Sequence, residues 1–224
     1  MTTIAVMQPY FVPHAGYFRL FAAADMVVLY DCVQFPRTGF VHRNRLPDTT
    51  GAPRWLTLPL RKAFRDVRIA DLAFADGAEH RLRRQARRFP VLRPLHAAPT
   101  DAWSRLLFDL SGTPTEYIAR WLRAACQAMG LPFDTVRSSS LLLSETLRGQ
   151  ERVLAIVRHF GASCYVNVPG GRALYDSERF ADEGVKLQFL ADYEGSDLSI
   201  LHRLLTEDRR EIGDEVRRLA VSTG

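Results

Sequence analysis

The first thirty residues contain a strand, a helix and a second strand in immediate succession, and no other feature of the sequence constrains the fold as much. Ile4–Met7 is a short apolar run that ends before Pro9, which predicts a first strand. Apolar residues then recur at helical spacing over Tyr17–Ala24. Met26–Tyr30 is continuously apolar, as expected for a strand buried on both faces. This order predicts a right-handed βαβ unit with two parallel strands.

Alternating helix and strand patterns continue along the rest of the chain, so we expect a single α/β domain over residues 1–224. Its predicted form is a three-layer sandwich with a mainly parallel sheet. The helix-rich stretch 79–129 is expected to be an insertion between the halves of the sheet, with one helix capped by Thr113 and Glu116. Further strands are predicted at Phe40–Leu46, Trp55–Leu60, Phe133–Val136, Cys164–Val168 and Val185–Leu190, and further helices at Glu79–Phe89, Asp101–Leu110, Glu116–Met129, Glu151–Phe160, Ser177–Asp182 and from Leu198 onward.

The composition indicates a globular cytoplasmic protein. The chain is 47% hydrophobic and 25% charged, which suffices for a core and is unlike disordered chains. No apolar run approaches the roughly 20 residues that span a bilayer, and the N-terminus lacks the pattern of a signal peptide, so we expect no membrane association. The odd set of Cys32, Cys126 and Cys164 fits reduced thiols. No metal-ligand spacing, P-loop or dinucleotide motif is present, so no metal or bound cofactor is predicted.

The charge balance favours anionic ligands. The formal net charge is +5, and nearly all cations are arginines, which suit planar, bidentate contacts to phosphate or carboxylate. A very basic helix invites a nucleic-acid interpretation, but Phe89 is its one nearby aromatic residue, so no base-stacking surface is predicted. A solvated helix face, or a docking face for an acidic carrier protein, is preferred. The arginines of this helix are Arg81, Arg83, Arg84, Arg87 and Arg88.

Polar residues crowd the carboxyl ends of the first two predicted strands, where open parallel sheets bind their ligands. Gly16 opens the first helix, so its neighbouring backbone N–H groups are expected to be free to hold an anion. His14 is either a phosphate ligand or a general acid, or a loop histidine packed on Tyr10. The polar residues after the first strand are Gln8, Tyr10 and His14, and those after the second are Asp31, Cys32 and Gln34. Tyr17 is predicted to bind substrate together with Gly16.

Two of these residues carry competing chemical interpretations. Asp31 is either a general base that binds a hydroxyl or an amine, or a cap for nearby N–H groups. Cys32 is either a nucleophile for a thioester intermediate or an inert thiol. The nucleophile needs a cation to lower the thiol pKa, and Arg37 or His42 would supply it.

Two further segments complete the predicted site. His42, Arg43, Asn44 and Arg45 follow one another on an extended segment, so Arg43 and Arg45 share one face and are expected to clamp a diphosphate. Asn167, Gly170 and Gly171 follow a late strand that should end at the same edge of the sheet, and glycines there allow a ligand to approach the backbone.

The runs MQPYFVPHAGYF, YDCVQFPRTGFVHRNRL and WLTLPL resemble the WbqC-like protein family, as do the later Tyr165-Val166-Asn167 and LSIL stretches. That family is associated with bacterial O-antigen and other surface-polysaccharide gene clusters, so the resemblance implies this pathway context. Cys32 stands where the family usually has a second Asp, and this weighs against the nucleophile.

Residues 13–17 are also similar to the His-x-Gly-His loop of nucleotidylyltransferases. The resemblance implies a nucleotidyltransferase-like, Rossmann-related fold and an anion site at His14 and Gly16. Tyr17 stands in place of the second histidine, and this departure argues against nucleotidyl transfer as the reaction.

These features predict a transferase that acts on a nucleotide-linked amino sugar or a related small metabolite, by acyl or aminoacyl transfer to an amine. Asp31 or His14 would deprotonate the amine, and the arginines would hold a diphosphate or a phosphopantetheine arm. The donor would be a coenzyme A or carrier-protein thioester. The alternatives are a nucleotidyltransferase or adenylating enzyme, and a non-catalytic module that binds a sugar nucleotide.

Overall fold

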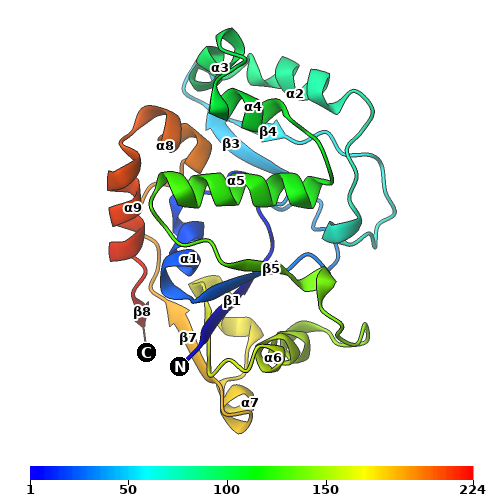
Figure 1. The fold of residues 1–224 in the computed structure, drawn as a ribbon, viewed down its shortest axis with the longest axis vertical. Coiled ribbons are helices and arrows are strands. Elements are labelled where there is room, and N and C mark those ends of the chain that lie inside the picture. Colours follow the sequence, from blue (N-terminus) through cyan, green and yellow to red (C-terminus); the bar gives the residue numbers. More distant parts are fainter. Residues whose placement is uncertain (224) are drawn as a thin grey trace.

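The structure, a computed structural model that describes residues 1–223, is built around a six-stranded sheet with the order β5-β2-β1-β6-β7-β8 (Figure 1). The first five strands in this order are parallel, and β8 runs antiparallel to β7. The predicted parallel pair at the N-terminus is confirmed, with Ile4 opposite Met26 and Met7 opposite Leu29. The strands are β1 (Thr3–Met7), β2 (Met26–Leu29), β5 (Thr135–Arg137), β6 (Cys164–Asn167), β7 (Lys186–Leu190) and β8 (Ser222–Thr223).

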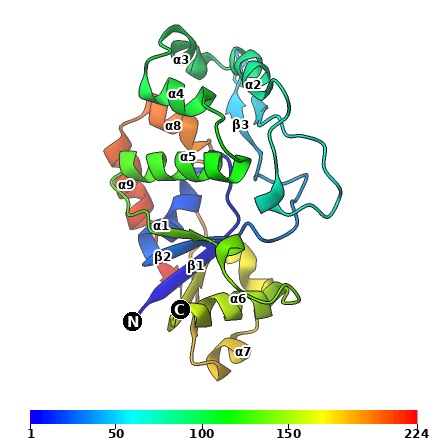
Figure 2. The same ribbon diagram turned by 45° about the vertical axis from the view of Figure 1, so that its right-hand side comes forward.

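Helices cover both faces of this sheet, which confirms the predicted three-layer α/β sandwich. On one face, Val28 and Tyr165 pack with Phe180 and the apolar side of α6. On the other, Val27 and Leu29 belong to a larger core that includes α1, α5, α8 and α9. Figures 1 and 2 show α5 on one side of the sheet and α6 with α7 on the other. The covering helices are α1 (Arg19–Ala23), α5 (Pro114–Ala128), α6 (Gly149–His159), α7 (Ser177–Asp182), α8 (Ile200–Thr206) and α9 (Arg209–Arg218).

A long connection between β2 and β5 contains the predicted hairpin and the three helices predicted within residues 79–129. The hairpin pairs β3 (Arg43–Pro47) with β4 (Pro53–Thr57). β3 begins later than predicted because residues 36–39 form a turn, closed by the Gly39 N–H on the Pro36 carbonyl. The capping box of Thr113 and Glu116 is confirmed at the start of α5. The other helices of the connection are α2 (Ala78–Ala86), α3 (Arg93–Ala97) and α4 (Ala102–Phe108), with short 3-10 turns at η2 (Ile69–Asp71) and η3 (Pro90–Leu92).

The helices of this connection do not form a separate core. Leu82 of α2, Phe108 of α4 and Trp121 of α5 belong to the same buried cluster as Val27 and Leu29 of the sheet. The connection therefore packs on the sheet through α5 and carries the hairpin, α2, α3 and α4 on the far side, as the upper part of Figure 2 shows. No helix among the described residues is long and apolar enough to cross a membrane.

The strand order places a topological switch point between β1 and β6. From β1 the chain moves to β2 and β5 on one side, and it then returns to β6 and β7 on the other. The loops that leave β1 and β6 diverge at this point, which opens a crevice at the carboxyl ends of these strands. Gln8 follows β1, Asn167 ends β6 and the 3-10 turn η5 (Pro169–Leu174) comes next, so three predicted site segments meet here.

Candidate functional site

A cavity of about 1180 Å³ lies at the carboxyl edge of the sheet, at the switch point. Its size suits a ligand as large as a nucleotide-linked sugar. Strand ends form its floor, the hairpin forms one wall, η5 a second and residues 192–198 a third. Aromatic side chains are prominent in the lining, namely Tyr10, Tyr17, Tyr30, Phe40, Tyr175 and Tyr193. The cavity includes ten predicted site residues: Gln8, Tyr10, His14, Gly16, Tyr17, Asn44, Arg45, Asn167, Gly170 and Gly171.

Two walls of this pocket are anchored to the loop that leaves β1. Val12 has a φ of 41°, a left-handed conformation that costs a β-branched residue energy. Its carbonyl accepts hydrogen bonds from the Asn44 amide at 2.8 Å and from the Ser199 hydroxyl at 2.6 Å. Asn44 comes from the hairpin and Ser199 precedes α8, and both are buried. The strained backbone at Val12 thus places one carbonyl where it binds both the hairpin and the segment before α8, the two segments that flank the pocket.

His14 is fixed as a hydrogen-bond donor toward the pocket. Its Nδ1 accepts the Gly16 N–H at 3.1 Å, so in the neutral ring the proton is on Nε2. Burial lowers the pKa of His14, an effect that the charge of Asp197 opposes. The ring is therefore neutral at pH 7. A general base at Nε2 would require the other tautomer, which would point an Nδ1 proton at the Gly16 N–H. The geometry favours His14 as a donor over a base.

The same contact corrects the prediction of an anion site at Gly16. The Gly16 N–H is occupied by His14, and the Tyr17 N–H donates to the His14 carbonyl. The predicted helix is also divided into a 3-10 turn, η1 (Ala15–Phe18), and the short α1, so no long helix dipole points at the pocket. The Tyr17 hydroxyl donates to the Gln8 carbonyl at 2.9 Å, which makes it a brace for the β1 end.

Asn167 and the following glycines form the second wall as predicted. The Asn167 Oδ1 accepts the Val168 N–H at 2.7 Å, and its Nδ2 has no acceptor among the described residues. A Cβ on Gly171 would lie 2.6 Å from this Nδ2, so a side chain there would have to displace the Asn167 amide. A Cβ on Gly170 would meet nothing within 4 Å. The Asn167 amide is thus available to a ligand, beside the backbone of two glycines that carry no side chain.

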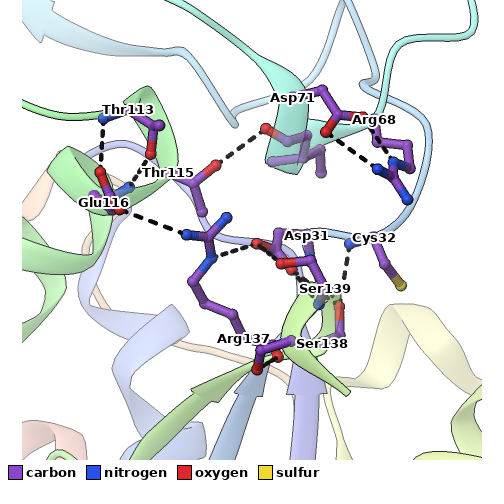
Figure 3. Close-up of polar contacts among 12 residues, drawn as sticks. Asp31, Cys32, Arg68, Asp71, Thr113, Thr115, Glu116, Arg137, Ser138 and Ser139 are labelled. Atoms are coloured by element: carbon purple, nitrogen blue, oxygen red, sulfur yellow. Dashed lines mark hydrogen bonds and ion pairs between the residues drawn. The ribbon is translucent and has the colours of Figure 1, made fainter. Parts of the chain in front are cut away.

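Asp31, predicted as a catalytic base, lies outside the pocket in a saturated network (Figure 3). Its carboxylate is fully buried and accepts the Arg137 Nε at 2.6 Å, the Ser139 N–H at 2.8 Å and both serine hydroxyls. The Ser138 hydroxyl also accepts the N–H groups of Asp31 and Cys32. With both oxygens occupied, Asp31 cannot take a proton from a ligand in the cavity. The capping interpretation is the correct one: Asp31 ties the end of β2 to the end of β5.

Four other predicted residues also lie outside the cavity, in or near the loop after β2. The Cys32 thiol points away from the Asp31 network (Figure 3). The Gln34 amide donates to the Arg65 carbonyl, and Arg37 donates to the carbonyls of Ala63 and Phe64. The sequence-based proposal that Arg37 or His42 activates Cys32 therefore fails, because Arg37 fastens the 61–66 loop. His42 packs edge-on against Phe35, and burial lowers its pKa to about 4, so it carries no charge.

The predicted arginine pair is held by a tryptophan. The guanidinium groups of Arg43 and Arg45 lie 4.3 and 5.0 Å from the ring centroid of Trp55, which confirms that the two side chains share a face. Arg45 lines the cavity and Arg43 does not, because Arg43 donates to the Thr38 and Gly39 carbonyls. A symmetric clamp is therefore wrong, and Arg45 is the hairpin cation that faces the cavity.

The lining also includes polar residues that the sequence reasoning missed, namely Arg19, Tyr30, Tyr175, Asp192, Tyr193 and Asp197. The loop 192–198 follows β7, so the edge rule that identified Asn167 would have found it too. Arg19 interrupts an otherwise apolar helical face, a pattern that indicates a buried cation with a specific partner.

Replacing Asp31 with Asn should lower the free energy of unfolding by roughly 3 kcal/mol, because it leaves Arg137 and the serine donors without their buried anion. Urea denaturation measures the change. Asp182→Asn, at the exposed end of α7, is the control and should change stability by less than about 0.5 kcal/mol. A stable Asp31→Asn protein that has lost only its activity would contradict the structural role.

Gly16→Ala should destabilise the protein by about 1–3 kcal/mol, because a Cβ there would lie 2.6 Å from the His14 ring and 2.7 Å from Tyr193. Gly170→Ala, in open space on the same pocket, should leave the thermal midpoint almost unchanged. Equal effects of the two substitutions in a thermal melt would refute the crowding at Gly16.

His42 should contribute to acid sensitivity. Its folded-state pKa of about 4 lies below the unfolded value of about 6.5, so the unfolded chain binds the proton more readily between these values. Stability should therefore be complete above pH 6.5 and fall as the pH drops toward 4. His42→Gln should reduce this fall in urea denaturation at stepped pH, and His80→Gln on the exposed face of α2 should not. Identical pH profiles for all three proteins would disprove the assignment.

No solved structure matches the chain. A relative from Mycobacterium tuberculosis, the uncharacterized protein Rv1507c, is 24% identical over 198 residues, which cover 87% of this chain and 84% of that protein. The model of the WbqC-like protein family matches residues 8–196, from the end of β1 to the third wall of the pocket. The chain therefore belongs to the WbqC-like protein family.

Proposed function

We propose that this protein is a transferase that acts on a nucleotide-linked amino sugar or a related anionic metabolite, by acyl or aminoacyl transfer to an amine. The observation that carries the proposal is the 1180 Å³ cavity at the switch point, where several aromatic rings and the exposed Arg45 line one space. Rings offer stacking surfaces to a base or a sugar, and an arginine without an acidic partner offers its donors to phosphate. The polysaccharide context implied by the family agrees with a sugar nucleotide.

The hairpin leaves Arg45 available for this role. The one acidic residue of the hairpin, Asp48, pairs with Arg54 at 3.1 Å. Among the described residues no carboxylate lies within ion-pair distance of Arg43 or Arg45, although both cations are held against Trp55. Stacking on the indole restricts the side-chain freedom of Arg45 before a ligand arrives, which lowers the entropic cost of binding phosphate.

In the proposed reaction the amine nitrogen attacks the carbonyl carbon of a coenzyme A or carrier-protein thioester. A C–N bond forms, the C–S bond breaks, and the thiolate leaves and takes up the proton that the nitrogen loses. The Nε2–H of His14 is the donor in the pocket that suits the oxygen of a developing tetrahedral intermediate. Asp31 takes no part in this scheme, because its oxygens are fully used by Arg137, Ser138 and Ser139.

A non-catalytic sugar-nucleotide-binding module is the second candidate. The saturation of Asp31 favours it, since the strongest acid–base residue predicted from the sequence is structural. The two candidates share the ligand and differ in turnover. A thermal-shift screen identifies which compounds bind the protein. The compounds to test are sugar nucleotides, nucleoside triphosphates, coenzyme A thioesters and carrier-protein thioesters. A ligand at a hundred times its dissociation constant stabilises by about 2.7 kcal/mol.

Replacing Arg45 with Ala should weaken binding of the sugar nucleotide found in that screen about tenfold or more, because a charge-assisted contact to phosphate is lost. Isothermal titration calorimetry measures the dissociation constant. Arg54→Ala is the matched control, since Arg54 lies on the same hairpin but outside the pocket. Unchanged affinity of Arg45→Ala for the sugar nucleotide would contradict the assignment of Arg45 to the phosphate site. Thioester-dependent acylation of the bound amine in a mass-spectrometric assay would decide for the transferase over the binding module.

A further inference from the structure

Positive and negative side chains lie on different walls of the pocket. Arg45 is the charged residue that the hairpin contributes, whereas the wall after β7 contributes Asp192 and Asp197. Both aspartates are exposed, and none of the ion pairs among the described residues involves them. The nearby Arg203 pairs with Glu207 and Glu215 instead. The pocket thus has an unpaired cation on one wall and two unpaired carboxylates on another.

A buried arginine between these carboxylates and the sheet also points to a ligand. Arg19 is 2% exposed, yet it lines the cavity. Its Nε and Nη1 groups donate to the carbonyls of Gly16, Ala191 and Leu219, and its Nη2 has no acceptor among the described residues. This N–H edge lies on the cavity, where an oxygen atom of a ligand can accept from it in place of water.

These groups lie within electrostatic reach of one another without direct pairing. The charge of Asp197 acts on His14, and the charge of Asp192 acts on Arg19. Neither aspartate forms an ion pair with Arg19 in the structure. Donors from His14 and Arg19 therefore face the same space as two carboxylate acceptors. An ammonium group with an oxygen on the adjacent carbon satisfies both sets, and an amino sugar carries this arrangement.

We infer that residues 192–198 form an amine subsite, in which Asp192 and Asp197 accept hydrogen bonds from the ammonium group of the ligand. Arg19 donates to a neighbouring sugar oxygen, and Arg45 holds the diphosphate at the other wall. The substrate class is a nucleoside diphosphate-linked sugar with a free amine. This inference rests on the proposed function, whose pocket it shares, and it makes the two aspartates specificity-determining residues.

The test compares matched ligands with matched variants. Nucleoside diphosphate-linked aminohexoses with uridine, thymidine or guanosine are each titrated beside their N-acetylated counterparts by isothermal titration calorimetry at pH 7. The proteins are wild type, Asp192→Asn, Asp197→Asn, the double variant, and Glu194→Gln. Glu194 lies between the two aspartates in sequence and is exposed, but it does not line the cavity. The substituted aspartates are exposed, so thermal melts should show intact folds.

Wild type and Glu194→Gln should prefer the free amine by about tenfold or more, as expected for a hydrogen bond between charged groups. The double Asn variant should lose this preference while it keeps its affinity for the acetylated ligand. Equal binding of amine and acetamide by wild type, or a preference that survives in the double variant, overturns the amine subsite and leaves the proposed function standing. Failure of every nucleotide-linked ligand to bind overturns the proposed function together with this inference.

Discussion

The site depends on one backbone carbonyl. Val12 adopts a φ of 41°, and in this conformation its carbonyl accepts from both Asn44 and Ser199. The first donor belongs to the hairpin between β2 and β5, and the second belongs to the segment that leads into α8. A β-branched residue in the left-handed region stores strain, which the two buried hydrogen bonds and the packing of the Val12 side chain offset. Two walls of the ligand cavity are therefore positioned by the loop that leaves β1.

The Asp31 network performs a similar task at the ends of β2 and β5, on the same edge of the sheet. Arg137 ends β5 and Ser138 and Ser139 follow it, and all three fasten the end of β2 through one carboxylate. The long connection between these strands carries the hairpin, so its two ends are held together by buried hydrogen bonds (Figure 3). An acid that the sequence marks as catalytic is thus part of the support for the pocket. Its chemistry is that of a satisfied buried anion, which holds neighbours and exchanges no proton.

The pocket itself combines aromatic surface with separated charge. Arg45, stacked on Trp55, lies on the hairpin wall, and Asp192 with Asp197 lies on the wall that follows β7. His14 contributes a neutral N–H donor because the Gly16 N–H fixes its tautomer. Under the proposed function, such a distribution would select ligands by the positions of their charges. It supports a bipolar metabolite as the ligand class of this WbqC-like protein.

The sequence by itself determined the layers of the fold and the edge of the sheet at which the cavity lies. Continuous apolar strands and helical periodicity are local signals, and the carboxyl-edge rule then predicted that Gln8, His14 and Asn167 lie together, as they do in the lining of the cavity. Only the tertiary structure decided which polar residues face the cavity. Asp31 binds Arg137, and Arg37 binds the 61–66 loop. No local sequence pattern encodes the positions of these partners. Asp192 and Asp197 enter the site because β7 lies beside β6, and strand order depends on long-range packing.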